Sequence, residues 1–422
     1  MTAFKNKVQE GLVSRLGARL YDSTTSAEQL NAHVAQEISD VMATTGVPLS
    51  TTERHALTAE ILDDVMGLGP IEKFLKDATI SEVMVNSLNP IFVERSGVIE
   101  QTSSVFMNEE HLRRVIERIV SQVGRRIDES SPMVDARLAD GSRVNAVIPP
   151  LAVDGPVLTI RKFSADPLQV DDLIRFGTIT AETALLLRAV VEAGLNIIVS
   201  GGTGTGKTTM LNVLSSFIPP GERVITIEDA VELQLQQDHV IRLESRPSNI
   251  EGRGEVSTRD LVRNALRMRP DRIIVGEVRG AEALDMLQAM NTGHEGSIST
   301  VHANSPRDAL ARLETMVLMS GVELPSKAIR EQVSSAIDLV VQIHRFRDGG
   351  RRVTHLTEVG RLEGDIVTSS DIFKLTTDPA TGRHSLDSTG VRPMLADRLL
   401  EAGIDLGKSL GSEWSNGWGG MR

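Results

Sequence analysis

The stretch Ile197-Ile198-Val199-Ser200-Gly201-Gly202-Thr203-Gly204-Thr205-Gly206-Lys207-Thr208-Thr209 lies near the middle of a chain of 422 residues. Its β-branched beginning predicts a buried strand, and the residues after the lysine predict a helix that reaches Phe217. Gly201 and Gly206 enclose four residues and precede Lys-Thr, which completes the phosphate-binding pattern G-x-x-x-x-G-K-[ST]. A glycine-rich turn that binds no nucleotide is the alternative, but it would require neither the strand nor the helix that flank this loop.

This loop predicts how a nucleotide is held. Glycine lets the backbone approach a phosphate closely, and the loop amides together with the helix N-terminus direct positive charge toward it. Lys207 would reach the β- and γ-phosphates, and the Thr208 hydroxyl would bind Mg²⁺. We therefore expect ATP and Mg²⁺ as cofactors, with the nucleotide bound by Gly201, Gly202, Thr203, Gly204, Thr205, Gly206, Lys207, Thr208 and Thr209.

Composition narrows the class of protein. The chain has 45 Lys and Arg against 57 Asp and Glu, a net charge of -12, which argues against a non-specific nucleic-acid binder, although a local basic strip stays open. It contains no Cys, so disulfides and thiolate metal sites are excluded. No run of about 18 apolar residues occurs, and the N-terminus lacks the apolar segment of a signal peptide. These observations favour a cytoplasmic protein.

The sequence divides into five segments, of which the first three precede the phosphate-binding region. Residues 1–66 are expected to form a helical N-terminal extension, because apolar residues recur every four positions at Phe4, Val8, Leu12, Leu16 and Leu20. Its role is left open between a small bundle and a module that docks a partner. Residues 67–164 combine short alternating strands with a helix at 108–123, which predicts an α+β domain with a hairpin at Asp140-Gly141. Residues 165–179 are expected to be a linker.

Residues 180–375 alternate helices with strands, which predicts a mainly parallel sheet with helices on both faces. In such an α/β domain the nucleotide lies at the carboxyl ends of the strands. A hairpin around Asp348-Gly349-Gly350 is expected to close the sheet. Residues 376–422 form a C-terminal segment, and its end from Gly411, rich in glycine and serine, is expected to be disordered.

Two predicted strands end on carboxylates. Ile273-Ile274-Val275-Gly276-Glu277 ends on Glu277, which could hold Mg²⁺ through water or activate the attacking water, and its length favours the role of general base. The strand at 224–227 leads into Glu228, which could order Mg²⁺ or water. A strand-end glutamate that faces solvent and an ordinary loop acid are the respective alternatives.

Two histidines enclose the predicted strand at 297–301. His294 and His302 could sense the γ-phosphate or couple the site to a neighbouring subunit. Zinc is disfavoured because the chain has no Cys and no third clustered His. The alternative for each is a structural histidine.

Phosphoryl transfer also requires positive charge at the γ-phosphate. Arg143 and Arg161, together with Arg137, lie in the strand-rich segment before the loop, and Arg279 follows Glu277 by two positions. The upstream arginines could instead line a solvated hairpin face. Arg279 could pair with a neighbouring carboxylate and have no catalytic role.

Four motifs occur in one order along the chain. They are Gly201 to Thr208, Thr226-Ile227-Glu228-Asp229, Ile274-Val275-Gly276-Glu277-Val278-Arg279-Gly280, and the histidine region from Thr292-Gly293-His294 to Val301-His302-Ala303-Asn304. They resemble the Walker A, Asp box, atypical Walker B and His box of the type II/type IV secretion ATPase superfamily. Two upstream stretches, Asp128-Glu129-Ser130-Ser131-Pro132-Met133-Val134-Asp135-Ala136-Arg137-Leu138 and Gly141-Ser142-Arg143-Val144-Asn145-Ala146, are similar to the CpaF subfamily, which powers tight-adherence (Flp-type) pili. The resemblance covers residues 64–375.

The resemblance implies a hexameric ring of subunits, each with a sensor-like N-terminal domain and a RecA-like P-loop motor domain. Residue by residue, it implies catalytic roles for Lys207, Glu228, Glu277, His294, His302, Arg143 and Arg161, and metal contacts for Thr208, Glu228 and Glu277. Arg143 and Arg161 resemble arginines that the family projects from the N-terminal domain onto the γ-phosphate. The zinc-binding Cys quartet of some type II members is absent here, and residues before 67 and after 375 lie outside the shared core.

The expected function is an ATP-hydrolysing motor that powers assembly of a tight-adherence pilus or a related secretion machine, with retraction left open. The motor would act through an inner-membrane platform protein and attach to the membrane peripherally through that partner. Three alternatives remain: a conjugative-type DNA or protein transfer ATPase of a type IV secretion system, a small-molecule kinase, and a non-hydrolysing assembly scaffold. The acidic charge counts against DNA handling, the large domain before the loop against a kinase, and Lys207 with Glu277 against a scaffold.

Overall fold

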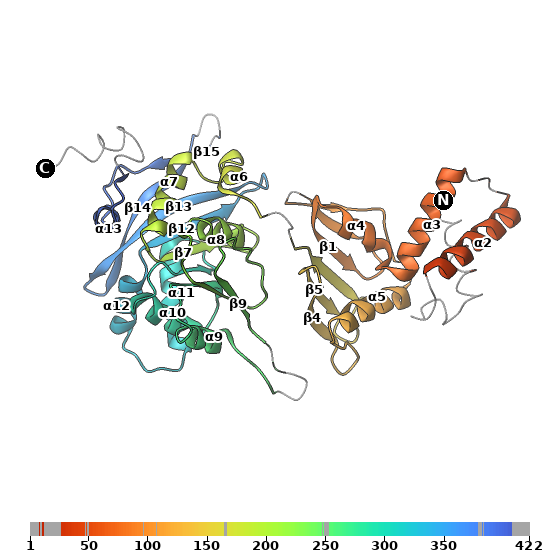
Figure 1. Cartoon of the computed structure of the whole chain (residues 1–422), viewed down its shortest axis with the longest axis horizontal. Coiled ribbons are helices and arrows are strands. Elements are labelled where there is room, and N and C mark those ends of the chain that lie inside the picture. Colours follow the sequence, from red (N-terminus) through yellow and green to blue (C-terminus); the bar gives the residue numbers. More distant parts are fainter. Residues whose placement is uncertain are drawn as a thin grey trace. The chain divides into compact units, whose positions relative to one another are not determined.

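The computed structural model describes residues 8, 11, 27–46, 48, 50–95, 97–106, 108–163, 167–246, 248, 253–378, 382 and 384–406. The chain divides into two compact units, Met1–Ser164 and Ala165–Arg422 (Figure 1). Apart from Val8 and Gly11, the first expected helix at 4–20 lies outside the described residues, as does the tail from Gly411. None of the helices within the described ranges is both long and apolar enough to span a bilayer.

Two helices precede the first sheet. α2 (Ala27–Thr45) buries Val34 and Ile38, and α3 (Thr51–Met66) packs against it. The N-terminus of α3 is capped reciprocally, since Ser50 Oγ accepts from the Glu53 amide at 3.2 Å and Glu53 Oε2 accepts from the Ser50 amide at 2.8 Å. This capping box gives partners to two amides near the helix start that the helix itself leaves without acceptors. These two segments are helical, as expected.

The first unit continues with an antiparallel sheet and its covering helix. Its elements are a 3-10 helix (Gly69–Ile71), α4 (Glu72–Lys76), β1 (Ile80–Asn86), β2 (Phe92–Arg95), β3 (Val98–Gln101), α5 (Glu109–Gln122), β4 (Met133–Arg137), β5 (Arg143–Val147) and β6 (Val157–Arg161). The strand order is β3-β2-β1-β6-β5-β4. The Asn108 side chain caps α5 by accepting from the His111 amide at 2.8 Å, and α5 buries Leu112 and Ile116 in the core that covers one sheet face. The expected α+β fold of residues 67–164 is confirmed.

The second unit holds a nine-stranded sheet in the order β15-β14-β13-β12-β7-β11-β10-β8-β9. Its strands are β7 (Ile197–Gly201), β8 (Val224–Glu228), β9 (Val240–Glu244), β10 (Arg272–Val278), β11 (Ile298–Val301), β12 (Leu339–Arg345), β13 (Arg351–Glu363), β14 (Ile366–Thr377) and β15 (His384–Ser388). Its helices are α6 (Val170–Arg175), α7 (Ala181–Glu192), α8 (Lys207–Ser215), α9 (Thr258–Ala265), α10 (Glu282–Asn291), α11 (Pro306–Met319), α12 (Ser326–Ala336) and α13 (Leu395–Glu401).

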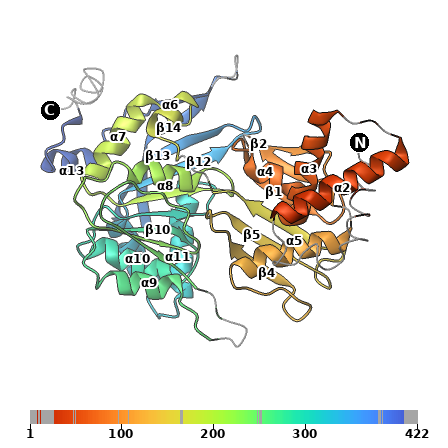
Figure 2. The same ribbon diagram turned by 45° about the vertical axis from the view of Figure 1, so that its right-hand side comes forward.

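Both faces of this sheet are buried by helices. Ile197 and Val199 of β7 belong to one core with α7, α8 and α13, whereas Ile198 between them belongs to a second core with α9, α10, α11 and α12 (Figure 2). Successive side chains of a strand point to opposite faces, so a run of apolar residues without alternation is what a doubly covered strand requires. The strands from β12 through β7, β11, β10 and β8 to β9 pair in parallel, so the expected parallel sheet with helices on both faces is confirmed.

The carboxyl-terminal part of the sheet is larger than the expected hairpin. β12 and β13 pair antiparallel as predicted, but β14 and β15 extend the sheet further. α13 adds Leu395 and Leu399 to the core shared with α7 and α8. β15 and α13, which lie in the segment expected to be separate, therefore belong to the second unit, and the expected linker at 165–179 contains α6.

Candidate nucleotide-binding and catalytic site

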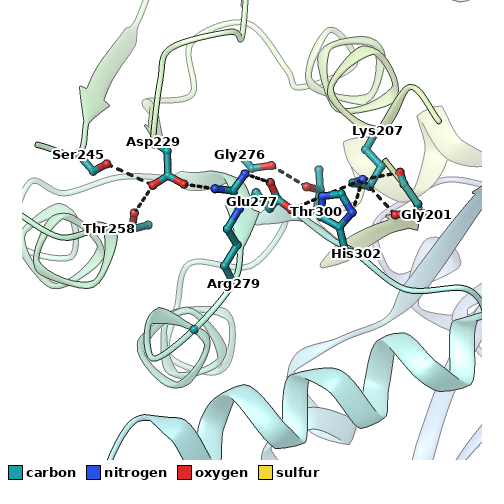
Figure 3. Close-up of polar contacts among 12 residues, drawn as sticks. Gly201, Lys207, Asp229, Ser245, Thr258, Gly276, Glu277, Arg279, Thr300 and His302 are labelled. Atoms are coloured by element: carbon teal, nitrogen blue, oxygen red, sulfur yellow. Dashed lines mark hydrogen bonds and ion pairs between the residues drawn. The ribbon is translucent and has the colours of Figure 1, made fainter. Parts of the chain in front are cut away.

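The parallel strands bring three side chains to one edge of the sheet. β7, β11 and β10 are neighbours and run in the same direction, so their carboxyl ends meet at that edge. Lys207 follows β7 across the loop, Glu277 is the second-to-last residue of β10, and His302 follows β11 directly. Figure 3 shows these residues side by side. Segments separated by about 100 residues in the sequence thus form one polar cluster.

The phosphate-binding loop holds its lysine inward. Lys207 is 8% exposed, and its Nζ donates to the carbonyl oxygens of Gly201 at 3.0 Å and Gly202 at 2.9 Å. The loop ends at Gly206, whose φ of 93° lies in the left-handed region that favours glycine, directly before α8. The ammonium group is therefore held against the loop at the start of α8, where a phosphate would bind.

Glu277 has a different environment at each carboxylate oxygen. Oε2 accepts from Arg279 Nη2 at 2.5 Å. Oε1 lies 2.5 Å from His302 Nε2, but this contact lacks hydrogen-bond geometry, and Oε1 is buried without a hydrogen-bond donor. The side chain of Glu277 is only 17% exposed. One oxygen is held in place while the other, on the side of Lys207 and His302, has an unmet demand for a donor such as water.

The surroundings of His302 lower the pKa of its imidazole and so favour the neutral ring. Burial lowers the pKa of His302, and the Lys207 ammonium, whose Nζ lies 3.4 Å from both ring nitrogens, lowers this pKa further. The carboxylate of Glu277 acts in the opposite direction but does not outweigh these effects. Its partner Arg279 has a raised pKa, caused first by the hydrogen bond to Glu277. The cluster therefore combines a neutral imidazole with two cations and one carboxylate.

Glu228 lies at the end of β8, beside β10, and is 4% exposed. Its Oε2 accepts from the amides of Glu232 at 2.7 Å and Leu233 at 3.0 Å, which fixes the turn after β8. A Cβ on Gly276 would lie 2.9 Å from Glu228 Cγ, so this side chain packs directly against the residue before Glu277. The described hydrogen bonds give Glu228 a role in the turn; a contact with Mg²⁺ or water stays a prediction.

The structure does not bring His294 to the same edge as His302. His294 precedes β11, whereas His302 follows it, so the length of the strand separates them. Nδ1 of His294 lies 3.1 Å from the carbonyl oxygen of Pro270, which precedes β10. Because parallel strands begin at the edge opposite to the one where they end, His294 lies away from Lys207 within this chain.

Arg143 and Arg161 lie in the first unit, as neighbours on adjacent strands. Arg143 of β5 is the register partner of Arg137 on β4 and of Arg161 on β6. Residues directly opposite one another point to the same sheet face, and this face is the one opposite the α5 core, which holds Val144 and Ile160. The three arginines thus form a row of like charge across three strands. Such a row attracts polyanions.

Two features near the loop were not predicted from the sequence. Arg351, at the start of β13, donates from Nε to the Gly204 carbonyl at 3.0 Å, and its register partner Arg345 lies beside the same loop. Asp229 pairs with Arg279 across the sheet edge at 3.0 Å. The contact of Arg351 with the loop depends on the length of the β12–β13 hairpin, which the sequence does not give. The pairing of Arg279 with Asp229 joins residues 50 positions apart, which local patterns do not connect. Arg279 does pair with a carboxylate, as one of the two interpretations expected.

The residues present fit a nucleotide with Mg²⁺. In the part of the chain that the structure describes, no group of three or more His, Cys, Asp or Glu side chains could hold a metal ion alone. Mg²⁺ is commonly bound by one or two protein oxygens together with phosphates and waters, so such a group is not required. The Thr208 hydroxyl at the first turn of α8 and the buried Oε1 of Glu277 are the donors that would face phosphate-bound Mg²⁺ and its waters.

A family model for type II/IV secretion system proteins matches residues 64–362, which is more than half of the chain. The chain belongs to the type II/IV secretion system protein family. Type IV secretion system protein PtlH of Bordetella pertussis is 38% identical over 312 residues, covering 68% of this chain and 91% of PtlH. Putative conjugal transfer protein Rv3659c of Mycobacterium tuberculosis is 36% identical over 346 residues, covering 80% of this chain and 98% of that protein.

A solved structure gives the same fold class. The crystal structure of the pilus retraction motor PilT with bound ADP matches with a TM-score of 0.50 and 18% identity, covering 82% of this chain and 88% of PilT. At this identity the likeness concerns the fold alone. Together with the family match it confirms the expected RecA-like α/β architecture. Membership of this family identifies the chain as a nucleotide-binding protein of the secretion ATPase class.

Proposed function

We propose that this protein hydrolyses ATP and acts as the motor of a pilus-assembly or secretion machine. The observation that carries the proposal is the convergence of Lys207, Glu277 and His302 at the carboxyl ends of β7, β10 and β11. A scaffold or a pure nucleotide sensor would need Lys207. It would not need a buried carboxylate beside Lys207 with one oxygen that lacks a hydrogen-bond donor. Hydrolysis needs both, because water must lose a proton as it attacks the γ-phosphate.

The chain's own residues supply most of this chemistry. Phosphates binding above the loop would replace the Gly201 and Gly202 carbonyls as partners of Lys207, and the amides at the start of α8 would bind the same oxygens. Glu277 Oε1 would accept a proton from the attacking water. The neutral ring of His302 would form one wall of the site. Bound Mg²⁺ would neutralise phosphate charge, with the Thr208 hydroxyl as a ligand and Glu228 and Glu277 contacting its waters.

The same proposal includes a hexameric ring and a role for the first unit of each subunit. Six subunits would place a nucleotide between the sensor-like first unit and the motor unit, near the next subunit. Arg143 and Arg161 would then reach the γ-phosphate and serve as the positive charge that phosphoryl transfer requires. His294, away from Lys207 in its own chain, would act at a subunit boundary if it has a role in coupling. Opening and closing across the nucleotide would convert hydrolysis into domain movement.

The machine we propose is a tight-adherence, Flp-type pilus. The stretches at 128–138 and 141–146 support this CpaF-type assignment by their resemblance. The motor would work in the cytoplasm and reach the membrane through an inner-membrane platform protein. A conjugative or type IV secretion ATPase is the second candidate, and the names of the two relatives favour it. Deleting the gene separates the two: loss of surface pili with intact DNA and protein transfer supports the first, and the reverse outcome supports the second.

Turnover measured against protein concentration tests the motor. We expect specific ATPase activity to rise steeply with concentration, because a site completed by a neighbouring subunit works only in the assembled ring. Arg143→Ala should lose most of this activity while still binding ATP. Arg113→Ala, at a partly exposed position of α5 where Arg113 pairs with Glu117 of the same helix, is the matched control and should behave as wild type. Activity that is linear in protein from a monomer would contradict the ring.

A further inference from the structure

Arg279 bridges two carboxylates, Glu277 on β10 and Asp229 directly after β8. Its Nη2 donates to Glu277 Oε2 at 2.5 Å and its Nη1 donates to Asp229 Oδ2 at 3.0 Å (Figure 3). The guanidinium is planar and rigid, so fixing one terminal nitrogen also fixes the direction of the other. The orientation of the Glu277 carboxylate is therefore tied to the position of Asp229.

Asp229 is in turn held by both ends of the connection between β9 and α9. Its Oδ1 accepts from Ser245 Oγ at 3.2 Å, directly after β9, and from Thr258 Oγ1 at 3.0 Å, at the start of α9. The backbone of Arg279 is fixed as well, because Glu282 Oε1 accepts from its amide at 2.6 Å. Arg279 thus leaves a fixed point on the chain and reaches toward a fixed acceptor.

Glu277 needs such support for the chemistry proposed above. A glutamate side chain has three torsions, and β10 fixes only its Cα. Holding Oε2 sets the plane of the carboxylate and leaves the buried Oε1 directed toward His302 and Lys207. A general base works only when its oxygen lies within hydrogen-bond reach of the water that it deprotonates. A small error in this placement costs a large factor in rate.

We propose that Arg279 is a positioning residue that aims Glu277, and that Asp229 acts on the reaction only through Arg279. The inference rests on the proposed ATPase function. Asp229, Arg279 and Glu277 together form a relay from Ser245 and Thr258 to the catalytic edge. A displacement of Ser245 or Thr258 would move Asp229 and so change the rate of hydrolysis without touching the nucleotide.

Kinetics of Arg279 and Asp229 variants test the relay. Arg279→Ala should lower kcat at least about tenfold with little change in KM, since orientation of the base affects the chemical step and not binding. Arg279→Lys keeps the charge but has one nitrogen, so it cannot hold both carboxylates and should recover little. Asp229→Asn should lower kcat less, and adding it to Arg279→Ala or Arg279→Lys should cause no further loss. Arg361→Ala, an exposed arginine on β13, is the control.

The outcomes separate the relay from the general function. Wild type and Arg361→Ala that hydrolyse ATP establish the activity by themselves. If Arg279→Ala then keeps kcat within about twofold of wild type, Arg279 does not position the base. If Asp229→Asn costs as much in the Arg279→Ala or Arg279→Lys background as alone, Asp229 acts independently and the relay is wrong. A loss of ATP affinity and thermal stability together, with kcat unchanged per bound nucleotide, would assign Arg279 a purely structural role.

Discussion

Gly201 and Gly202 are neighbours in the phosphate-binding loop, but their surroundings differ. A Cβ on Gly201 would lie 2.6 Å from the carbonyl oxygen of Ile343 on β12 and equally close to Thr205 Oγ1. The carbonyl belongs to the backbone of a buried neighbouring strand and cannot move away easily. A Cβ on Gly202 would meet its nearest neighbour, Thr205 Cγ2, at 3.8 Å, which is ordinary contact. The loop thus excludes a methyl group at Gly201 and tolerates one at Gly202.

This contrast gives a prediction for the nucleotide-free protein. Gly201→Ala should reduce the free energy of unfolding by about 1–3 kcal/mol, because the added methyl group overpacks a site with no room. Gly202→Ala should change it by less than about 0.5 kcal/mol. Urea denaturation followed by circular dichroism measures both. Equal stability of the two variants would show that β12 does not press on the loop.

At the scale of single residues, the sequence indicates which residues are candidates for the site better than it indicates which side chains they contact. The loop pattern was sufficient to identify Lys207, and an apolar strand ending on a carboxylate was sufficient to single out Glu277. The position of His294 could not be read from the sequence, because it depends on which edge of the sheet each end of β11 reaches. The pairing of Arg279 with Asp229 depends on the order of β8 and β10 in the sheet, which local patterns do not contain.

Among the elements, α13 is attached to the sheet by two carboxylates. Asp338, just before β12, accepts from the Asn196 amide at 2.7 Å and pairs with Arg398 of α13. Glu358 of β13 accepts from the amides of Met394, at 2.9 Å, and Leu395, where α13 begins. Burial raises the pKa of Asp338 and of Glu358 above their usual values. The Arg398 guanidinium at Asp338, and the Met394 and Leu395 amides at Glu358, only partly oppose this.

These raised pKa values determine the sign of a pH effect. The folded chain binds protons at Asp338 and Glu358 at pH values where the unfolded chain has lost them, so their contribution to the free energy of unfolding is present at low pH and declines as pH rises through the raised pKa values. Asp338→Asn removes one such group. We expect the stability of wild type relative to Asp338→Asn to decrease from pH 4.5 to pH 7.5, tested at these two values by urea denaturation.

The control for this experiment is Asp365→Asn, in the exposed turn between β13 and β14. It should show no such trend relative to wild type. A difference between wild type and Asp338→Asn that stays constant or grows with pH would mean that the ion pair with Arg398 outweighs burial. α13 itself could not be predicted as part of this unit, because its short apolar pattern, Leu395, Ala396 and Leu399, shows burial but not the partner.

The strands β9 and β14 were not predicted for a similar reason. β14 carries Thr-Ser-Ser-Asp in its first half and β9 is only half-buried, so neither shows the apolar run that identifies a central strand. The central strands β7, β8, β10 and β11 are largely buried and mainly apolar, and they were predicted with nearly their observed bounds. Edge and extension strands are specified by pairing with a neighbour already in place, which a single stretch of sequence does not reveal.

At the scale of the whole molecule, two units carry different parts of the proposed chemistry. The second unit holds the loop, Glu277 and His302, the residues that we propose bind and polarise the nucleotide. The first unit carries the row of Arg137, Arg143 and Arg161 on the sheet face opposite the α5 core. In the proposed function, hydrolysis needs residues from both units, so the chemical step is linked to movement, as a motor requires.

The substitution Glu277→Gln tests the central claim, that the strand ends form a hydrolytic site with Glu277 as its base. The change keeps the size of the side chain and removes its ability to accept a proton. We predict that it binds a fluorescent ATP analogue as wild type does, while phosphate release falls at least about a hundredfold. Glu323→Gln, on the exposed loop before α12, should match wild type. Phosphate release by Glu277→Gln at close to the wild-type rate would contradict the account.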